Sequence, residues 1–234
     1  MTNTTTTDLS YDPYDRDIDA DPYPVYRRLR EEAPLYYNEP YDFYAVSRFD
    51  DVQRGLVDRE TYSSARGSVL EFIKADIEMP PGVDIFEDPP QHTAHRGLLS
   101  RVFTPKRMNA LEPKVRFEPP TPHVARYVAR EVELYGTTVP AGSALICLSG
   151  SANRDDRHYA DADRFDIHRE IGQHLTFGYG IHYCLGAALA RLEGRVALDE
   201  VLTRFPEWDV DWDNVMRAPT STVRGWESLP VFTT

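Results

Sequence analysis

The segment from Phe177 to Gly186 constrains this chain most, because it places one cysteine between glycines just before a strong helical pattern. That cysteine is Cys184. The unpaired N–H groups and the positive dipole end at a helix N-terminus stabilise an anionic sulfur. Glycines in such a loop let the backbone approach a large flat ligand where a Cβ atom would clash. The segment therefore predicts a reactive thiolate beside a bound ligand.

The composition is that of an acidic globular protein. The chain has 234 residues, with 38 Asp and Glu against 26 Lys and Arg. This balance argues against nucleic acid or an anionic membrane as partner. Two cysteines, Cys147 and Cys184, are too few for a disulfide framework, so a cytoplasmic location is expected. The sequence shows no signal peptide and no apolar run long enough for a membrane span.

The cysteine loop resembles the haem-binding loop of the cytochrome P-450 family, Phe-x-x-Gly-x-x-x-Cys-x-Gly. Phe177, Gly180, Cys184 and Gly186 match its four fixed positions. The resemblance implies that Cys184 is the proximal thiolate ligand of the iron of a haem b. It also implies that Phe177, Gly178 and the two matched glycines contact this cofactor.

Four basic residues match positions at which the family binds the haem propionates. His92 and Arg96 lie in a segment that resembles the start of a helix beside the haem, and their spacing of four puts both on one helix face. Arg126 falls where the family places another propionate-binding arginine, and His182 matches a fourth contact. The resemblance implies that these side chains hold the two carboxylates.

Periodicity and turn residues predict many short elements. Helices are expected at residues 22–32, 49–56, 91–103 and 185–205 and after Thr104-Pro105, strands within 35–46, 124–146 and 208–232, and irregular chain at 64–90 and 149–173. The fold that the resemblance implies is α+β and mainly α. It is a cytochrome P-450 fold that lacks the central distal helix and the helices that cap the substrate pocket.

The resemblance is interrupted between Arg116 and Phe117. Leu111–Arg116 matches the end of an early helix, whereas Phe117–Pro120 matches a segment that the family places much later. The central helix over the distal haem face, with its acid–threonine pair, has no counterpart in the sequence. The Glu-x-x-Arg spacing of the family is also absent from the sequence.

We therefore predict one incomplete domain at residues 21–234, preceded by a flexible lead-in at 1–20. Its N-terminal block is 21–116, and its haem-binding C-terminal block is 117–234. Because the missing helices would cover one side of the haem, the resemblance predicts weak haem retention, aggregation or pairing with another chain.

The resemblance implies a haem-thiolate monooxygenase that oxidises a small lipophilic substrate with O₂ and with electrons from a redox partner. A ferredoxin-type donor is implied, and Arg191 and Arg195 are candidates for docking an acidic partner. The apolar stretch Val69–Phe86 favours a lipophilic ligand. The alternative is a non-catalytic remnant, a haem-binding or interaction module without the distal oxygen-activation machinery.

Simpler interpretations of the same residues stay open. Cys184 could be an ordinary buried thiol. It could also join His182, Cys147 and His174 in a zinc site, although no Cys-x-x-Cys or His-x-x-x-His pair supports one. The basic pair at the start of the helix expected at 91–103 could be a solvated helix face.

Overall fold

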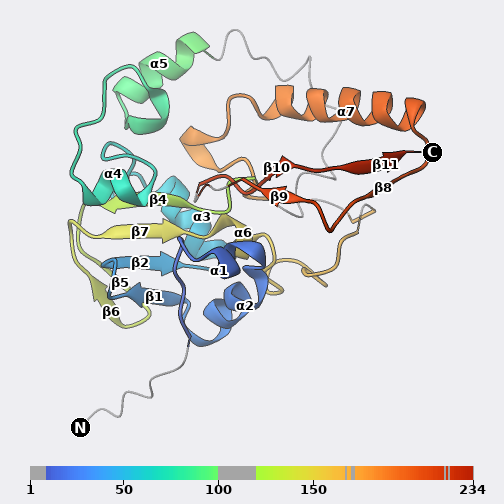
Figure 1. The fold of residues 1–234 in the computed structure, drawn as a ribbon. Helices are drawn as coiled ribbons and strands as arrows, with labels where there is room; N and C mark the ends of the chain where they lie inside the picture. Colours follow the sequence, from blue (N-terminus) through green and yellow to red (C-terminus); the bar gives the residue numbers. More distant parts are fainter. Residues whose placement is uncertain are drawn as a thin grey trace.

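The structure is a computed structural model that describes residues 9–99, 120–166, 168–169, 172–218, 220 and 222–233. Its centre is a five-stranded sheet with the strand order β1-β2-β7-β4-β3 (Figure 1). The strands are β1 Leu35–Asn38, β2 Phe43–Val46, β3 Tyr62–Ser63, β4 Val124–Val128 and β7 Ala144–Cys147. The strands predicted within 35–46 and 124–146 are therefore confirmed.

The sheet joins the two halves of the chain through β7. β2 runs parallel to β7, with Ala45 opposite Ile146, and β4 runs antiparallel to it, with Arg126 opposite Leu145. All four residues of β7 are buried. Strands from both predicted blocks are thus hydrogen-bonded into one sheet, and this pairing sets the position of Arg126.

Each face of the sheet has its own hydrophobic core, because successive residues of a strand point to opposite faces. Leu145 belongs to the core that contains helix α3 (Phe49–Val57). Ile146 belongs to the other core, which contains α2 (Tyr23–Glu32) and α4 (Leu70–Lys74). Helices therefore cover both faces of the central strands, as their apolar composition requires.

The lead-in is docked over the part that the structure describes. Tyr11 is 2% exposed, and its carbonyl accepts a hydrogen bond of 2.9 Å from the Asn38 side chain. Helix α1 (Arg16–Ala20) follows, and the Asp15 carboxylate caps its first N–H groups. The flexible lead-in expected up to residue 20 is thus not observed over residues 9–20, because apolar side chains there enter the core.

Short helices interrupt two stretches that were expected to be irregular. Residues 64–90 contain α4 and the 3₁₀ helix η1 (Asp84–Phe86), and residues 149–173 begin with α6 (Ser149–Ala152). None of these helices exceeds five residues, which is too short for a periodic pattern to reveal it.

Helix α5 (Gln91–Leu99) confirms the helix expected from Gln91 over its described length. The helix expected after Thr104-Pro105 and the break expected between Arg116 and Phe117 lie outside the described residues. The hairpin of β5 (Val132–Leu134) and β6 (Thr137–Val139) confirms the predicted strand-turn pattern.

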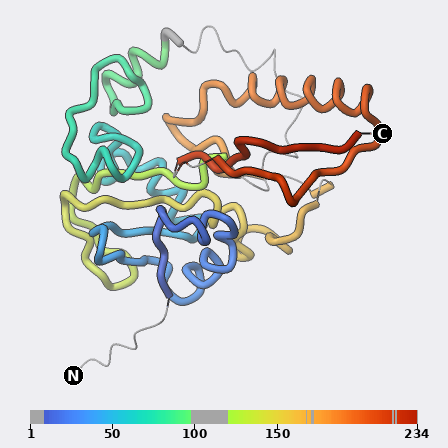
Figure 2. Tube along the Cα trace, viewed as in Figure 1, coloured from blue at the N-terminus to red at the C-terminus, as the bar shows by residue number. Residues whose placement is uncertain are grey.

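The C-terminal part of the chain lies to one side of the central sheet (Figures 1 and 2). It consists of helix α7 and two strand pairs. The pairs are β8 (Trp208–Val210) with β11 (Val231–Thr233), and β9 (Met216–Arg217) with β10 (Trp226–Ser228). These elements confirm the strand-like pieces predicted in the tail.

Helix α7 (Ala187–Arg204) is the longest described helix, and Ala187 is its one buried residue. Leu189, Val196 and Leu202 are 37%, 50% and 44% exposed. Helices with apolar residues on several sides are usually covered by neighbouring elements. Within the described part of the chain, α7 therefore presents apolar surface to solvent. No helix of that part has the length and apolarity that a bilayer crossing needs.

Candidate functional site

The cysteine loop is a closed turn between Leu175 and the start of α7. The Cys184 N–H donates to the Phe177 carbonyl at 2.8 Å, which joins the two ends of the loop. The 3₁₀ helix η3 (Gly180–His182) fills the turn between them. Cys184 is a free, exposed thiol, so the interpretation of it as an ordinary buried thiol is wrong.

Asn153 fixes the chain immediately before this loop. Its side-chain oxygen accepts a hydrogen bond of 2.8 Å from the Leu175 N–H, and its side-chain nitrogen donates to the Thr176 hydroxyl at 3.0 Å. Asn153 is 4% exposed. The loop therefore starts from an anchored point in the core.

The glycines of the loop have different roles. Gly178 and Gly180 have φ of +72° and +71°, a backbone region that favours glycine. A Cβ atom on Gly180 would lie 3.3 Å from the Leu56 carbonyl oxygen, so Gly180 packs on the end of α3. Gly178 and Gly186 line a cavity, but Gly180 is not among the described residues that line it.

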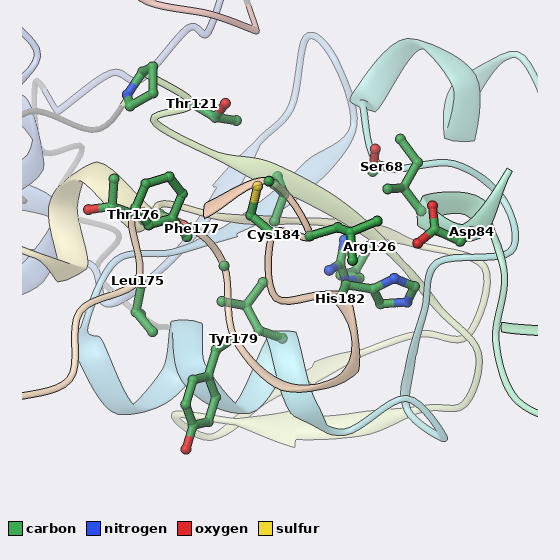
Figure 3. A pocket seen from close by; sticks show the side chains of 18 of the residues that line it. Ser68, Asp84, Thr121, Arg126, Leu175, Thr176, Phe177, Tyr179, His182 and Cys184 are labelled. Carbon is green, nitrogen blue, oxygen red and sulfur yellow. The ribbon is translucent and has the colours of Figure 1, made fainter. Parts of the chain in front are cut away.

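The loop forms one wall of a cavity of about 480 Å³ (Figure 3). This volume lies within the range of about 300–1,000 Å³ that is typical of ligand pockets. Apolar and basic side chains share its lining. The apolar ones include Leu56, Ile85, Val124, Leu175, Phe177 and Leu185, and the charged or titratable ones are Asp84, Arg96, Arg126, Tyr179, His182 and Cys184.

Arg126 and His182 are two basic residues of this lining, and the Arg126 side chain and both ring nitrogens of His182 are buried. Arg126, on β4, is 5% exposed, and its guanidinium donates to the Ala125 carbonyl at 2.9 Å. Burial lowers the pKa of Arg126. Burial, together with the neighbouring Arg126 and His92, lowers the pKa of His182 to about 4. The His182 ring and the Arg126 guanidinium thus lie close together where water has little access.

His92 completes this basic group from helix α5. Its ring centroid lies 4.5 Å from that of His182, and it is 3% exposed. Burial, and after it the charge of Arg96, lowers the pKa of His92. The buried Nε2 of His92 and both ring nitrogens of His182 have no hydrogen-bond partner in the described structure. The solvated helix face proposed as an alternative is therefore wrong for His92.

Arg96 ties α5 to the cysteine loop. Its guanidinium donates to the Tyr183 carbonyl and, at 3.2 Å, to the Asp84 carboxylate. His95, one residue earlier, points elsewhere and pairs with Glu87 at 2.7 Å. The structure thus brings Arg96, Arg126 and His182 together with Cys184 in the lining of one cavity, and His92 contacts the His182 ring.

The zinc alternative has no support in the described residues, in which no group of three or more His, Cys, Asp or Glu side chains could hold a metal ion. Cys147 lies on β7 at 0% exposure, and burial raises the pKa of its thiol to about 11. A thiol in this state is a core side chain.

Two features of the site were not predicted from the sequence. The Arg191 guanidinium lies 4.8 Å from the Phe177 ring centroid and donates to the Tyr183 hydroxyl at 3.2 Å. Asp84 is the acidic residue of the cavity lining. Arg191 is the fifth residue of α7, and the residue count alone does not show that its side chain faces the loop.

Comparisons with known proteins agree on one family. The family model described as Cytochrome P450 matches residues 109–222. "Putative cytochrome P450 123" of Mycobacterium tuberculosis is 28% identical over 389 residues, covering 96% of this chain and 97% of the relative. "6-deoxyerythronolide B hydroxylase" of Saccharopolyspora erythraea is 41% identical over 125 residues, which cover 53% of this chain and 31% of the relative.

The fold comparison gives the same result. The structure of cytochrome P450 CYP109Q5 from Chondromyces apiculatus superposes with a TM-score of 0.82 at 20% identity, covering 97% of this chain and 98% of that one. This likeness confirms the predicted α+β, mainly helical fold. The first alignment spans 389 positions whereas the chain has 234 residues, so at least 155 positions have no residue of this chain opposite them. The motif, the fold and the relatives together show that the chain is a shortened member of the cytochrome P450 family.

Proposed function

We propose that this chain binds a haem b through Cys184 and that the bound haem gives it the thiolate-ligated centre of its family. The observation that carries the proposal is the convergence of an exposed thiol with buried, partly unsatisfied basic groups on one cavity. Cytochrome P450 family members bind haem and are haem-thiolate monooxygenases in general.

The residues around the cavity fit the propionates and the apolar macrocycle of a haem. Buried polar atoms without a partner are costly, so the ring nitrogens of His92 and His182 call for an anionic or hydrogen-bonding ligand. Buried Arg126 has the same need, because charge-assisted bonds to a carboxylate would offset its burial. Haem carries two propionates, and the apolar lining around Phe177 suits its macrocycle.

Each part of the site would have a distinct task. Cys184 would supply the axial thiolate, and the loop bond from its N–H to the Phe177 carbonyl would fix the backbone that carries it. Arg126, His182, His92 and Arg96 would orient the haem by binding its propionate carboxylates. Gly178 and Gly186 leave room at the cavity wall. When bound, the haem supplies the electron transfer and oxygen chemistry of the family.

The finer assignments belong to the same proposal. The reaction would oxidise a small lipophilic substrate with O₂, and a ferredoxin-type protein would supply the electrons. Within the apolar stretch Val69–Phe86, Ile85 lines the cavity, whereas Leu70 and Ile73 lie in the core. Ile85 is therefore the residue of that stretch that we assign to the lipophilic pocket.

Domain organisation and location are also proposals. A single incomplete domain from residue 21 to 234 is supported by the sheet, since β2 comes from the block 21–116 and β4 and β7 from the block 117–234. Residues 9–20 extend this domain at its N-terminal side. The two free cysteines support a reducing cytoplasm.

A second candidate function is a non-catalytic remnant that binds haem or a partner without turnover. Two observations favour it. At least 155 aligned positions have no counterpart in this chain, and apart from α7 the longest described helix is α2, with 10 residues. Among the described helices only α7 is longer, and it directly follows the cysteine loop.

Haem titration followed by a turnover assay separates the two candidates. Wild-type protein is expected to take up one haem with a thiolate-type spectrum, and Cys184→Ala is expected to lose that spectrum. Equal uptake and equal spectra in the two proteins would contradict the site. Oxidation of a lipophilic probe such as a fatty acid, with a ferredoxin and its reductase, supports the monooxygenase. Stoichiometric haem binding with no oxidation supports the remnant.

A further inference from the structure

We infer that Arg191 of α7 is a positioning residue that clamps the cysteine loop, and that it is not a docking charge for a redox partner. The consequence for haem rests on the proposed function. The clamp itself is a property of this chain's own residues.

The loop has two aromatic side chains at its ends. Phe177 opens the loop and Tyr183 directly precedes Cys184, and their ring centroids lie 6.4 Å apart at an interplanar angle of 66°. The backbone bond from the Cys184 N–H to the Phe177 carbonyl joins the same two ends. A contact that holds both rings would therefore also fix the position of the Cys184 backbone.

Arg191 makes that contact with both rings at once. Its guanidinium carbon lies 4.8 Å from the Phe177 ring centroid, and its Nη2 donates to the Tyr183 hydroxyl at 3.2 Å. A planar guanidinium can stack on one ring and direct an N–H to the other, whereas a lysine ammonium lacks this planar fork. One side chain of α7 thus holds both ends of the loop.

Arg195, one turn further along α7, has the surroundings expected of a surface charge. Its side chain is 46% exposed and pairs with the exposed Asp199 carboxylate at 4.0 Å. Arg191 is only partly exposed and is engaged by the loop. The two arginines carry the same charge on the same helix, so Arg195 is a matched control for Arg191.

The position of Cys184 matters because ligand geometry at a functional site must hold to within about 0.5 Å. Cys184 and Phe177 line the same cavity wall, and Figure 3 shows them side by side there. If Phe177 and Tyr183 move apart, the bond between the Cys184 N–H and the Phe177 carbonyl weakens. The sulfur then loses its fixed position.

The first test is hydrogen exchange on the haem-free full-length protein, measured on peptides that cover residues 177–186. We compare Arg191→Gln, Arg191→Lys, Tyr183→Phe and Arg195→Gln with the wild type. Both Arg191 variants are expected to exchange about tenfold faster in this segment, and Tyr183→Phe less so, given the size of one stacking contact and one hydrogen bond. Arg195→Gln and all β7 peptides are expected to match the wild type.

Arg191→Lys decides between geometry and charge, because it keeps the charge and loses the planar contact. Wild-type exchange in Arg191→Lys, or equal exchange in Arg191→Gln and Arg195→Gln, would overturn the clamp. Faster exchange in both Arg191 variants supports it.

The second test uses haem-loaded protein and transfer of haem to excess apomyoglobin. Both Arg191 variants are expected to release haem about tenfold faster, in line with the same two contacts, and to show a larger share of ferrous carbon monoxide complex without the thiolate band. Unchanged release and unchanged spectra would overturn the positioning role. If the wild type takes up no haem, the proposed function fails, and the exchange experiment still decides the clamp.

Discussion

His92 meets His182, a residue of the cavity lining, edge to face, with ring centroids 4.5 Å apart and an interplanar angle of 64°. One comes from helix α5 and the other from the cysteine loop. The Nε2 of His92 and both ring nitrogens of His182 are buried and lack hydrogen-bond partners in the described structure. Unpaired buried nitrogens are costly for the protein alone, which is why we propose an anionic ligand at this place.

Arg126→Met is expected to change stability and haem affinity in opposite directions. Replacing a buried charge that has no carboxylate partner by an apolar side chain of similar size should stabilise the haem-free protein by about 1–2 kcal/mol. The loss of a charge-assisted contact to a propionate should weaken haem binding about tenfold. Urea unfolding and haem titration measure the two effects.

Exposed Arg130 is the control, because its carboxylate neighbours Asp58 and Glu60 lie 3.9 and 3.7 Å away at the surface. Arg130→Met should leave both quantities near the wild-type values. If Arg126→Met destabilises the haem-free protein, the bond to the Ala125 carbonyl already compensates the buried guanidinium, and its assignment to an anion is wrong.

Lowering the pH should destabilise the protein, because histidines that are neutral in the folded state bind protons more readily in the unfolded chain. Burial lowers the pKa of His123 from 6.5 to about 4, so the unfolded chain binds a proton more readily than the folded one between these values. The contribution of His123 to stability is complete above pH 6.5 and falls by about 1.4 kcal/mol per pH unit as pH drops toward 4.

His123→Phe should therefore flatten the decline of the unfolding free energy over this pH range by the equivalent of one proton. The lowered pKa values of His92 and His182 act in the same direction, so part of the decline should remain. A variant with the full wild-type slope would show that His123 is protonated or solvated in the native state.

The docked lead-in predicts a stability cost at Tyr11. Tyr11→Ala should destabilise the protein by about 3 kcal/mol, because it removes a large, nearly fully buried ring from the core. Tyr14→Ala is the matched control, since Tyr14 is 39% exposed, and its cost should stay below about 1 kcal/mol. Equal small effects in thermal unfolding would mean that the segment is loosely held.

The exposed face of α7 predicts that Val196→Glu costs little stability. Surface substitutions usually change unfolding free energy by no more than about 0.5 kcal/mol, and Val196 is 50% exposed. The same change should reduce self-association, measured by light scattering during gel filtration, because it interrupts an apolar surface. A loss of several kcal/mol would instead place Val196 in a buried interface.

The sequence predicted the sheet and the cysteine site more fully than the packing around them. Alternating apolar residues identified the strands of 35–46 and 124–146, but nothing in a strand's own sequence shows that β2 pairs parallel to β7. The docking of Tyr11 escaped prediction because one apolar residue in a polar segment forms no pattern.

The candidate site likewise has residues that the sequence could indicate and contacts that it could not. Cys184 and the basic residues around it could be proposed because each matches a position of the family's haem site. The clamp by Arg191 depends on which side of α7 faces the loop, which no residue count reveals. Gly180 was expected to make room for the cofactor, and it packs against Leu56.

The carbon monoxide difference spectrum of the reduced, haem-loaded protein tests whether Cys184 binds the haem iron. Thiolate ligation by Cys184 predicts the band of thiolate-ligated haem in the wild type and in Cys147→Ser, whose thiol is buried in β7. It predicts the complete loss of that band in Cys184→Ala, whose missing thiol is the exposed one. A thiolate band that persists in Cys184→Ala, or a haem-loaded wild type that shows none, would contradict the claim that Cys184 binds the haem iron.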